Sequence, residues 1–314
     1  TGGIGRAAAV QIVALGGWDV YITGRNLERA EKAAAGVNTD AGATDAATGN
    51  GHSGLPKGRC FGVGPLDLGA RSIIETFVES WVATGRGINT LLLNAGAEIP
   101  EKRLSADGIE LTIAANHLAF FLLTRLLLPT IKATPGPRRV VTVASFMHDK
   151  DGPGFGQPKD VGLVFDDLEF TTRPYQPMLA YSNSKLANIV FSMELARRLK
   201  AEGSDVAACC LSPGFVPASD FMRQFSCWIV CCMRCCAHPC CCFMCGRIQT
   251  LEIGATTEAY CATSEEVESG KYYLHTQKPF ATSAHAADPE VWAQLWKWSE
   301  RRLKLDELAD DKAN

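Results

Sequence analysis

Three short apolar runs, separated by helix-length segments, constrain the fold of this chain more than any other feature. They are Ile88–Leu93, Arg139–Ala144 and Val206–Leu211, and each leads into a polar or glycine-containing turn. Successive strand residues point to opposite faces of a sheet, so a nearly continuous apolar run predicts a strand buried on both faces. Because strands and helices alternate along the chain, we predict a doubly wound α/β fold with a parallel sheet.

The remaining pattern adds strands at Trp18–Thr23 and Cys60–Val63, and helices at Leu27–Ala35, Ile73–Trp81, Gly108–Leu128 and beyond Ala180. Neither a repeat nor a linker is visible, so we expect residues 1–314 to form one domain. Residues 38–58 are rich in Gly, Ala, Thr and Asp and have few apolar anchors. Such a composition cannot bury a core, which predicts a flexible surface insertion.

A glycine turn opens the first predicted helix. Gly3, Ile4 and Gly5 precede Arg6–Val10, and glycines there let the backbone approach a pyrophosphate at the helix N-terminus. The following strand ends at Gly24-Arg25-Asn26, where a fold that prefers NAD usually carries an acidic residue. An arginine suits a ribose 2′-phosphate, so we predict NADP(H) as the cofactor. The alternative is that Arg25 is a solvated residue at a strand end.

Tyr181 and Lys185 are four residues apart in the segment AYSNSKLAN. On a helix both side chains emerge on one face, one turn apart. A lysine ammonium within about 4–6 Å favours tyrosinate and lowers the pKa of the phenol by roughly 1–3 units. Such a tyrosine could exchange a proton with an alcohol or ketone. The alternative is an ordinary surface Tyr and Lys.

Charge, apolar runs and cysteine content limit the kinds of partner and the cellular compartment that we expect. The net charge of −3 gives no reason to expect a nucleic acid or an anionic membrane as partner. No stretch of about 18 uncharged apolar residues is present, so a membrane-spanning helix is not predicted. Of 13 cysteines, those outside the segment 225–245 are scattered, which argues against a secreted disulfide framework and for a reducing compartment such as the cytoplasm.

Taken together and in this order, the motifs resemble the short-chain dehydrogenase/reductase superfamily, whose fold is the Rossmann fold. They are the GIG turn, Asn94-Ala95-Gly96, Asn116, Ser145, Tyr181-x-x-x-Lys185 and Pro213-Gly214. Within the family, the helix containing Asn116, the segment VVTVASFMH and the C-terminal segment are most similar to the retinol dehydrogenase-like branch. The family's first strand and the first glycine of its motif are missing, so we expect the sequence to be a fragment or a faulty gene model.

The resemblance implies a role for each matching position. Tyr181 would be the general acid or base, Lys185 would lower its pKa and hold the nicotinamide ribose, and Ser145 would bind the substrate oxygen. Asn116 would hold a water that links Lys185 to solvent. The remaining positions would bind NADP(H): Gly3, Ile4 and Gly5 at the pyrophosphate, Arg25 and Asn26 at the 2′-phosphate, Asp67 and Leu68 at the adenine, Asn94, Ala95 and Gly96 beside the ribose, and Pro213, Gly214 and Val216 by the nicotinamide.

Residues 225–245 form an unusual cysteine run where the family has a substrate-covering lid. Cys232-x-x-Cys235 and Cys242-x-x-Cys245 have local metal-ligand spacing, but only six residues separate the pairs, fewer than the roughly 15–20 of zinc ribbons. We therefore assign no metal site. Palmitoylation or shallow membrane contact is one alternative, and an apolar lid or a mistranslated intron is another.

The predicted function is an NADP(H)-dependent oxidoreductase that interconverts a small lipophilic alcohol and its aldehyde or ketone. The apolar lid segment and the branch resemblance support a lipophilic substrate. A protochlorophyllide reductase-like enzyme and a non-catalytic NADP(H)-binding regulatory protein are the alternatives. The complete set of Asn116, Ser145, Tyr181 and Lys185 argues against the regulator, because binding alone does not need all four. The oligomeric state is left open.

Overall fold

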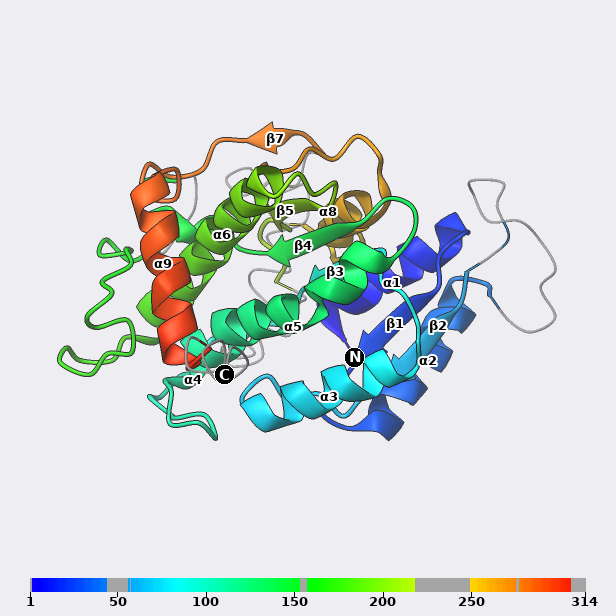
Figure 1. The fold of residues 1–314 in the computed structure, drawn as a ribbon, viewed down its shortest axis with the longest axis horizontal. Helices are drawn as coiled ribbons and strands as arrows, with labels where there is room; N and C mark the ends of the chain where they lie inside the picture. Colours follow the sequence, from blue (N-terminus) through cyan, green and yellow to red (C-terminus); the bar gives the residue numbers. More distant parts are fainter. Residues whose placement is uncertain are drawn as a thin grey trace, which may run out of the picture. The chain divides into compact units, whose positions relative to one another are not determined.

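A computed structural model describes residues 2–43, 56, 58–152, 157–217, 249–274 and 277–305 (Figure 1). Alternating strands and helices give the predicted α/β fold with parallel strands. The chain divides into two compact units. Unit 1 comprises Thr1–Asp67, Pro213–Ser264 and Leu274–Lys278, and unit 2 comprises Leu68–Ser212, Glu265–Tyr273 and Pro279–Asn314.

Unit 1 is built on a pair of parallel strands, β1 and β2, in which Val20 lies opposite Cys60. Small buried side chains, among them Ala9, Val13 and Ala34, form its core and let the helices approach the strands closely. The helices are α1 (Gly3–Leu15), α2 (Leu27–Asp40) and α8 (Leu251–Thr263), and the strands are β1 (Val20–Thr23) and β2 (Cys60–Val63).

Unit 2 contains a five-stranded sheet in the order β3-β4-β5-β6-β7. The first three strands are parallel, and β7 is antiparallel to β6. The strands are β3 (Thr90–Leu93), β4 (Arg139–Val143), β5 (Ala207–Ser212), β6 (Tyr272–Leu274) and β7 (Pro279–Phe280). The helices are α3 (Arg71–Ala83), α4 (Leu111–Ile113), α5 (Ala119–Ala133), α6 (Pro177–Ala201) and α9 (Pro289–Arg302), with a π-helical turn η1 (Ala114–Leu118) and a 3-10 turn η2 (Phe146–His148).

An aromatic cluster joins three helices of unit 2. Trp296 of α9 lies 4.8 Å from Phe121 of α5 and 6.1 Å from Phe191 of α6, measured between ring centroids. These rings are nearly inaccessible to water, so they contribute to the core by apolar burial and by edge contacts. Helix α9, drawn in red in Figure 1, is thereby fixed to α5 and α6.

Besides small differences at helix ends, such as α3 starting at Arg71 and ending at Ala83, the structure departs from the expected helices in two places. Helix α2 continues to Asp40, because Asn38 bonds both backbone groups of Cys60 and so ties the helix end to β2. Residues 44–55 and 57, most of the expected insertion, lie outside the described residues. The expected continuous helix Gly108–Leu128 starts only at Leu111 and contains the turn η1.

The stretch Leu111–Ala133 is, among the described residues, long and apolar enough to cross a membrane, with a mean hydropathy of 1.6. The sequence pattern did not predict such a helix. Because 72% of its most apolar window is buried inside the protein, it has the surroundings of a core helix.

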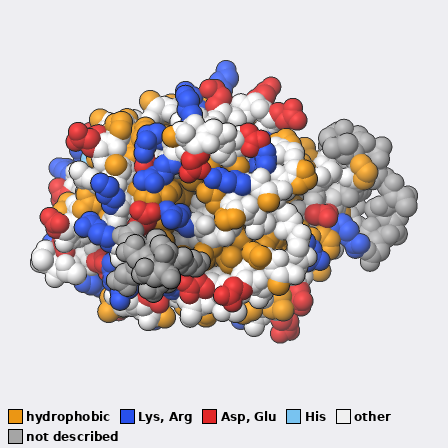
Figure 2. Space-filling model, viewed as in Figure 1, with side chains coloured by type: hydrophobic (Ala, Val, Ile, Leu, Met, Phe, Trp, Pro, Cys, Tyr) orange, Lys and Arg blue, Asp and Glu red, His pale blue; other side chains and the backbone are white. Residues whose placement is uncertain are grey.

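On the face shown in Figure 2, Lys and Arg side chains are interspersed with Asp and Glu side chains.

Gly62 allows β2 to pass close to α2. A Cβ atom at this position would lie 2.3 Å from the backbone nitrogen of Glu31 and 2.4 Å from the carbonyl carbon of Ala30. We predict that Gly62→Ala lowers the free energy of unfolding by about 1–3 kcal/mol, the usual cost of overpacking, or by more because the clash is with backbone. Denaturant titration measures it. Gly162→Ala is the control, since its Cβ would meet nothing within 4 Å; equal effects of the two changes would contradict this account.

Candidate active site

Tyr181 and Lys185 both belong to α6 and are buried, with 9% and 3% of their surface exposed. Helix α6 is buried along most of its length, so the two side chains are held inside unit 2. The ammonium of Lys185 donates to the carbonyl oxygen of Val143 at 3.0 Å and lies 5.7 Å from the Tyr181 ring centroid. The same carbonyl, in the last residue of β4, accepts a bond from Asn188. The pair predicted from the sequence therefore lies at the carboxyl end of a central strand.

Ser145 follows β4 and reaches the Tyr181 hydroxyl. Its side chain is hydrogen-bonded to Tyr181, and its hydroxyl also accepts from the backbone N–H of Met147 at 3.2 Å. The backbone carbonyl of Ser145 is bonded to Nδ1 of His148 at 2.8 Å. Burial lowers the pKa of His148, which keeps the imidazole neutral. Hydrogen bonds to its side chain and to its backbone thus fix the position of Ser145.

Asn116 lies in the π-helical turn η1, where its side chain is 1% exposed. Its amide nitrogen donates to the carbonyl of Ala97 at 2.8 Å and to the hydroxyl of Ser184 at 2.9 Å, and its amide oxygen accepts from the N–H of Ala97 at 2.9 Å. Both amide hydrogens are therefore used within the protein. Asn116 links the loop after β3 to α6. Its holding of a water molecule stays a prediction.

The loop Asn94-Ala95-Gly96 follows β3 and passes against these side chains. A Cβ atom at Gly96 would lie 2.8 Å from Nζ of Lys185 and 3.4 Å from Oδ1 of Asn116. Any larger residue here would push the ammonium from its place. The structure thus brings together in unit 2 the four predicted catalytic residues and this loop.

The electrostatics of Tyr181 differ from the sequence expectation. Instead of lying below its ordinary value, the pKa of Tyr181 is raised to about 12, chiefly because burial disfavours the charged phenolate. The hydrogen bond from Ser145 acts in the opposite direction, and the carboxylate of Glu98 raises the pKa further. The Lys185 ammonium lies 5.7 Å from the ring centroid of Tyr181 and donates to the carbonyl of Val143.

The glycine turn, in unit 1, forms the N-terminus of α1. Gly3 has φ of 59°, a value that glycine adopts without strain. The N-cap residue is Gly2, which has no side chain to cap the helix, and the first turn contains no acidic residue. The unsatisfied N–H groups and the positive end of the helix dipole fit an anionic group such as a pyrophosphate.

The other predicted cofactor residues of unit 1 lie after strands. Arg25 follows β1 with an exposed side chain, whereas Asn26 uses its side-chain oxygen to cap α2, accepting from the N–H of Arg29 at 2.9 Å. Asp67 follows β2. Pro213, Gly214 and Val216 follow β5, where Val216 packs so closely on α8 that a Cβ at Gly254 would lie 2.7 Å from it. Leu68 begins unit 2.

Comparison with known proteins identifies the family. Human retinol dehydrogenase 12 is 31% identical over 300 residues, a match that covers 95% of this chain and 82% of the relative. The chain belongs to the retinol dehydrogenase-like branch of the short-chain dehydrogenase/reductase superfamily. Human retinol dehydrogenase 11 is 32% identical over 302 residues and is 80% covered. No protein-family model matches the chain.

Solved structures share this fold. An uncharacterised protein from Mycobacterium paratuberculosis matches with a TM-score of 0.66 and 28% identity, covering 96% of this chain and 90% of that chain. L-Sorbose reductase from Gluconobacter frateurii, solved with NADPH and L-sorbose, matches with a TM-score of 0.59 over 87% of this chain and 90% of that chain. Its identity of 18% supports the fold alone.

Sequence reasoning missed three residues of this short-chain dehydrogenase/reductase site. Ala97 binds Asn116 through its backbone, which no sequence signal reveals. Ser184 lies between Tyr181 and Lys185 and donates to the Tyr181 carbonyl at 2.7 Å, so its place in the motif could have drawn attention. Glu98, half-buried with a raised pKa, acts on Tyr181 through space.

No metal site accompanies the active site in the part of the chain that the structure describes, where no group of three or more His, Cys, Asp or Glu residues could hold an ion. The four described cysteines, Cys60, Cys209, Cys210 and Cys261, are buried, and none of these four forms a disulfide. The cysteine run 225–245 lies outside the described residues.

Proposed function

We propose that this protein is an NADP(H)-dependent oxidoreductase that interconverts a small lipophilic alcohol and its aldehyde or ketone. The observation that carries the proposal is the buried contact between Tyr181 and Ser145, beside Lys185 and Asn116. Membership of the retinol dehydrogenase-like branch supports the lipophilic substrate. The cysteine run 225–245 as a lid or a peripheral membrane contact, and residues 1–314 as a single domain, stay proposals.

In carbonyl reduction, Tyr181 donates a proton to the substrate oxygen, and in alcohol oxidation it accepts one. The Ser145 hydroxyl, already bonded to Tyr181, orients the same oxygen and stabilises its developing charge. Lys185 holds the nicotinamide ribose, and Asn116 holds the loop Asn94-Ala95-Gly96 in place through its bonds to Ala97. The bound cofactor supplies hydride transfer, and the protein supplies position and electrostatics.

The uncapped N-terminus of α1 supports placing the pyrophosphate at Gly3, Ile4 and Gly5. The exposed guanidinium of Arg25 is available for the 2′-phosphate, with the adenine by Asp67 and Leu68. Because the Asn26 side chain already caps α2, its part in binding would come through its backbone. Pro213, Gly214 and Val216 are proposed beside the nicotinamide.

Tyr181→Phe tests the assignment of the proton donor. The change removes only the hydroxyl, so we expect turnover of a lipophilic aldehyde such as retinal to fall by at least about 100-fold, within the usual contribution of acid–base catalysis. The Kd for NADPH, measured by fluorescence, should stay within about twofold. Retention of a tenth of the activity would contradict this role. A wild-type protein that binds NADPH but turns over no alcohol, aldehyde or ketone would favour the non-catalytic regulatory protein.

Arg25→Ala tests cofactor preference. A charge-assisted hydrogen bond contributes roughly 1.5–3 kcal/mol, so loss of the guanidinium should weaken NADPH binding about tenfold or more and leave NADH binding nearly unchanged. Calorimetric titration with both cofactors measures the difference. Arg29→Ala, at an exposed position in the first turn of α2, is the control and should alter neither affinity. Equal losses for both cofactors in Arg25→Ala would assign Arg25 a structural role only.

Glu98→Gln tests the electrostatics of the site. The negative charge of Glu98 disfavours tyrosinate and so raises the pKa of Tyr181; its removal should lower that pKa. Alcohol oxidation needs Tyr181 as a base, so the rise of kcat/KM with pH should shift to lower pH in the variant. The control is Glu101→Gln, an exposed carboxylate in the same loop. An unchanged profile, or a shift to higher pH, would show that Glu98 does not act on the catalytic tyrosine.

A further inference from the structure

Helix α9 reaches the active-site turn η1 although it supplies no residue to the site itself. Two side chains of its last turn, Ser299 and Arg302, make contacts that lead to the segment containing Asn116. They are three residues apart, so they lie on one face of the helix. Ser299 is bonded to His117, whereas Arg302 is bonded to Glu169 and Gly108.

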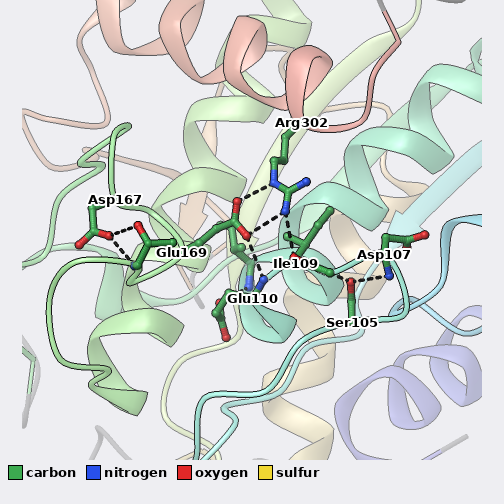
Figure 3. Close-up of polar contacts among 10 residues, drawn as sticks. Ser105, Asp107, Ile109, Glu110, Asp167, Glu169 and Arg302 are labelled. Carbon is green, nitrogen blue, oxygen red and sulfur yellow. Dashed lines mark hydrogen bonds and ion pairs between the residues drawn. The ribbon is translucent and has the colours of Figure 1, made fainter.

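The first contact is an ion pair shown in Figure 3. Arg302 donates to both carboxylate oxygens of Glu169, at 2.6 and 3.1 Å, and also to the carbonyl of Gly108 at 3.1 Å. A two-pronged contact of this kind fixes orientation as well as distance. The ion pair joins the end of α9 to the loop before α6, and the bond to Gly108 joins it to the segment that precedes α4.

Glu169 also contacts the N-terminus of α4. Its carboxylate accepts from the backbone N–H of Glu110 at 3.2 Å. Glu110, whose side chain is fully buried, caps α4 by accepting from the N–H groups of Thr112 at 2.8 Å and Ile113 at 2.9 Å. A buried carboxylate is tolerated because these bonds satisfy it, and so the start of the helix has a fixed place.

The second contact reaches the residue next to Asn116. The Ser299 hydroxyl donates to the carbonyl of Leu295 and is bonded to Nε2 of His117 at 2.9 Å. Because the serine hydrogen is already used, His117 is the donor to Ser299. His117 is fully buried, and burial lowers its pKa to about 3, so the imidazole is neutral.

Little chain separates these contacts from the active site. Helix α4 has three residues and continues directly into η1, so Asn116 follows the Glu110 cap without a loop. A π-helical turn holds an extra residue in the helix and is commonly found at functional sites. A shift at the cap or at His117 is therefore transmitted to the Asn116 amide and to its bonds with Ala97 and Ser184.

We propose that Ser299 and Arg302 of α9 are positioning residues, which hold the turn η1 so that Asn116 keeps the loop after β3 and helix α6 in catalytic register. Arg302 acts through Glu169 and Glu110, and Ser299 acts through His117. The kinetic part of this inference rests on the function proposed above, whereas its structural part does not.

Hydrogen exchange tests the structural part without turnover. Arg302→Ala and Ser299→Ala should each speed exchange of the amides in residues 111–118 by about tenfold or more, because the turn loses a tether. Glu300→Gln is the matched control: Glu300 lies between the two residues and pairs with Arg125 of α5 rather than with Glu169 or His117. Unchanged protection in both alanine variants, or an equal change in Glu300→Gln, would overturn the proposal.

Kinetics test the functional part. Arg302→Ala should lower kcat about 10- to 100-fold, as small misplacements of catalytic groups do, with the Kd for NADPH within about twofold. Glu300→Gln should keep wild-type kcat. In an Asn116→Ala background, Arg302→Ala should cost at most about twofold more, because its effect passes through Asn116. Full additivity of the two changes would overturn the positioning role.

The outcomes separate this inference from the proposed function. A wild-type chain without turnover, together with faster exchange in Arg302→Ala and Ser299→Ala, would refute the proposed oxidoreductase and support the tether. Wild-type turnover that is lost in Tyr181→Phe but unaffected by Arg302→Ala and Ser299→Ala would support the enzyme and overturn the positioning role.

Discussion

The double hydrogen bond between the Asn116 amide and the backbone of Ala97 is the interaction on which the rest of the site depends. It joins the loop after β3 to the turn η1, and the third bond of the amide, to Ser184, joins both to α6. Three segments that are far apart in the chain thus meet at one side chain. A buried amide left without these partners would carry a large desolvation cost, so the burial of Asn116 and the position of the loop require each other.

Burial sets the chemistry of the site as much as the identity of its residues does. The fold places Tyr181 in an environment that disfavours its charged form, and Ser145 and Glu98 then act on the hydroxyl in opposite directions. A phenol held neutral beside a hydrogen-bonding serine suits proton donation. The prediction from the Tyr–Lys spacing alone therefore gave the wrong direction for the shift in the pKa of Tyr181. The spacing indicates a nearby positive charge, but it does not indicate that the phenol is buried away from water.

Polar networks outside the site support its geometry. The ion pair of Arg302 with Glu169 joins α9 to the loop before α6, and the bond of His117 to Ser299 joins α9 to η1. Each connects residues more than a hundred positions apart, so neither leaves a local trace in the sequence. The aromatic contacts of Trp296 with Phe121 and Phe191 give α9 the apolar anchorage that these polar contacts need.

The sequence by itself determined the α/β fold, the family and the four candidate catalytic residues, because strand burial, helical spacing and the order of motifs are properties of short segments. The tertiary structure decided the π-helical turn at Asn116 and the extension of α2 through Asn38. It also decided the electrostatic effect of Glu98 on Tyr181 and the ion pair that α9 forms with Glu169. These features arise from contacts between distant segments and from exclusion of water. Neither is encoded in residue spacing, since both exist only after the chain has folded.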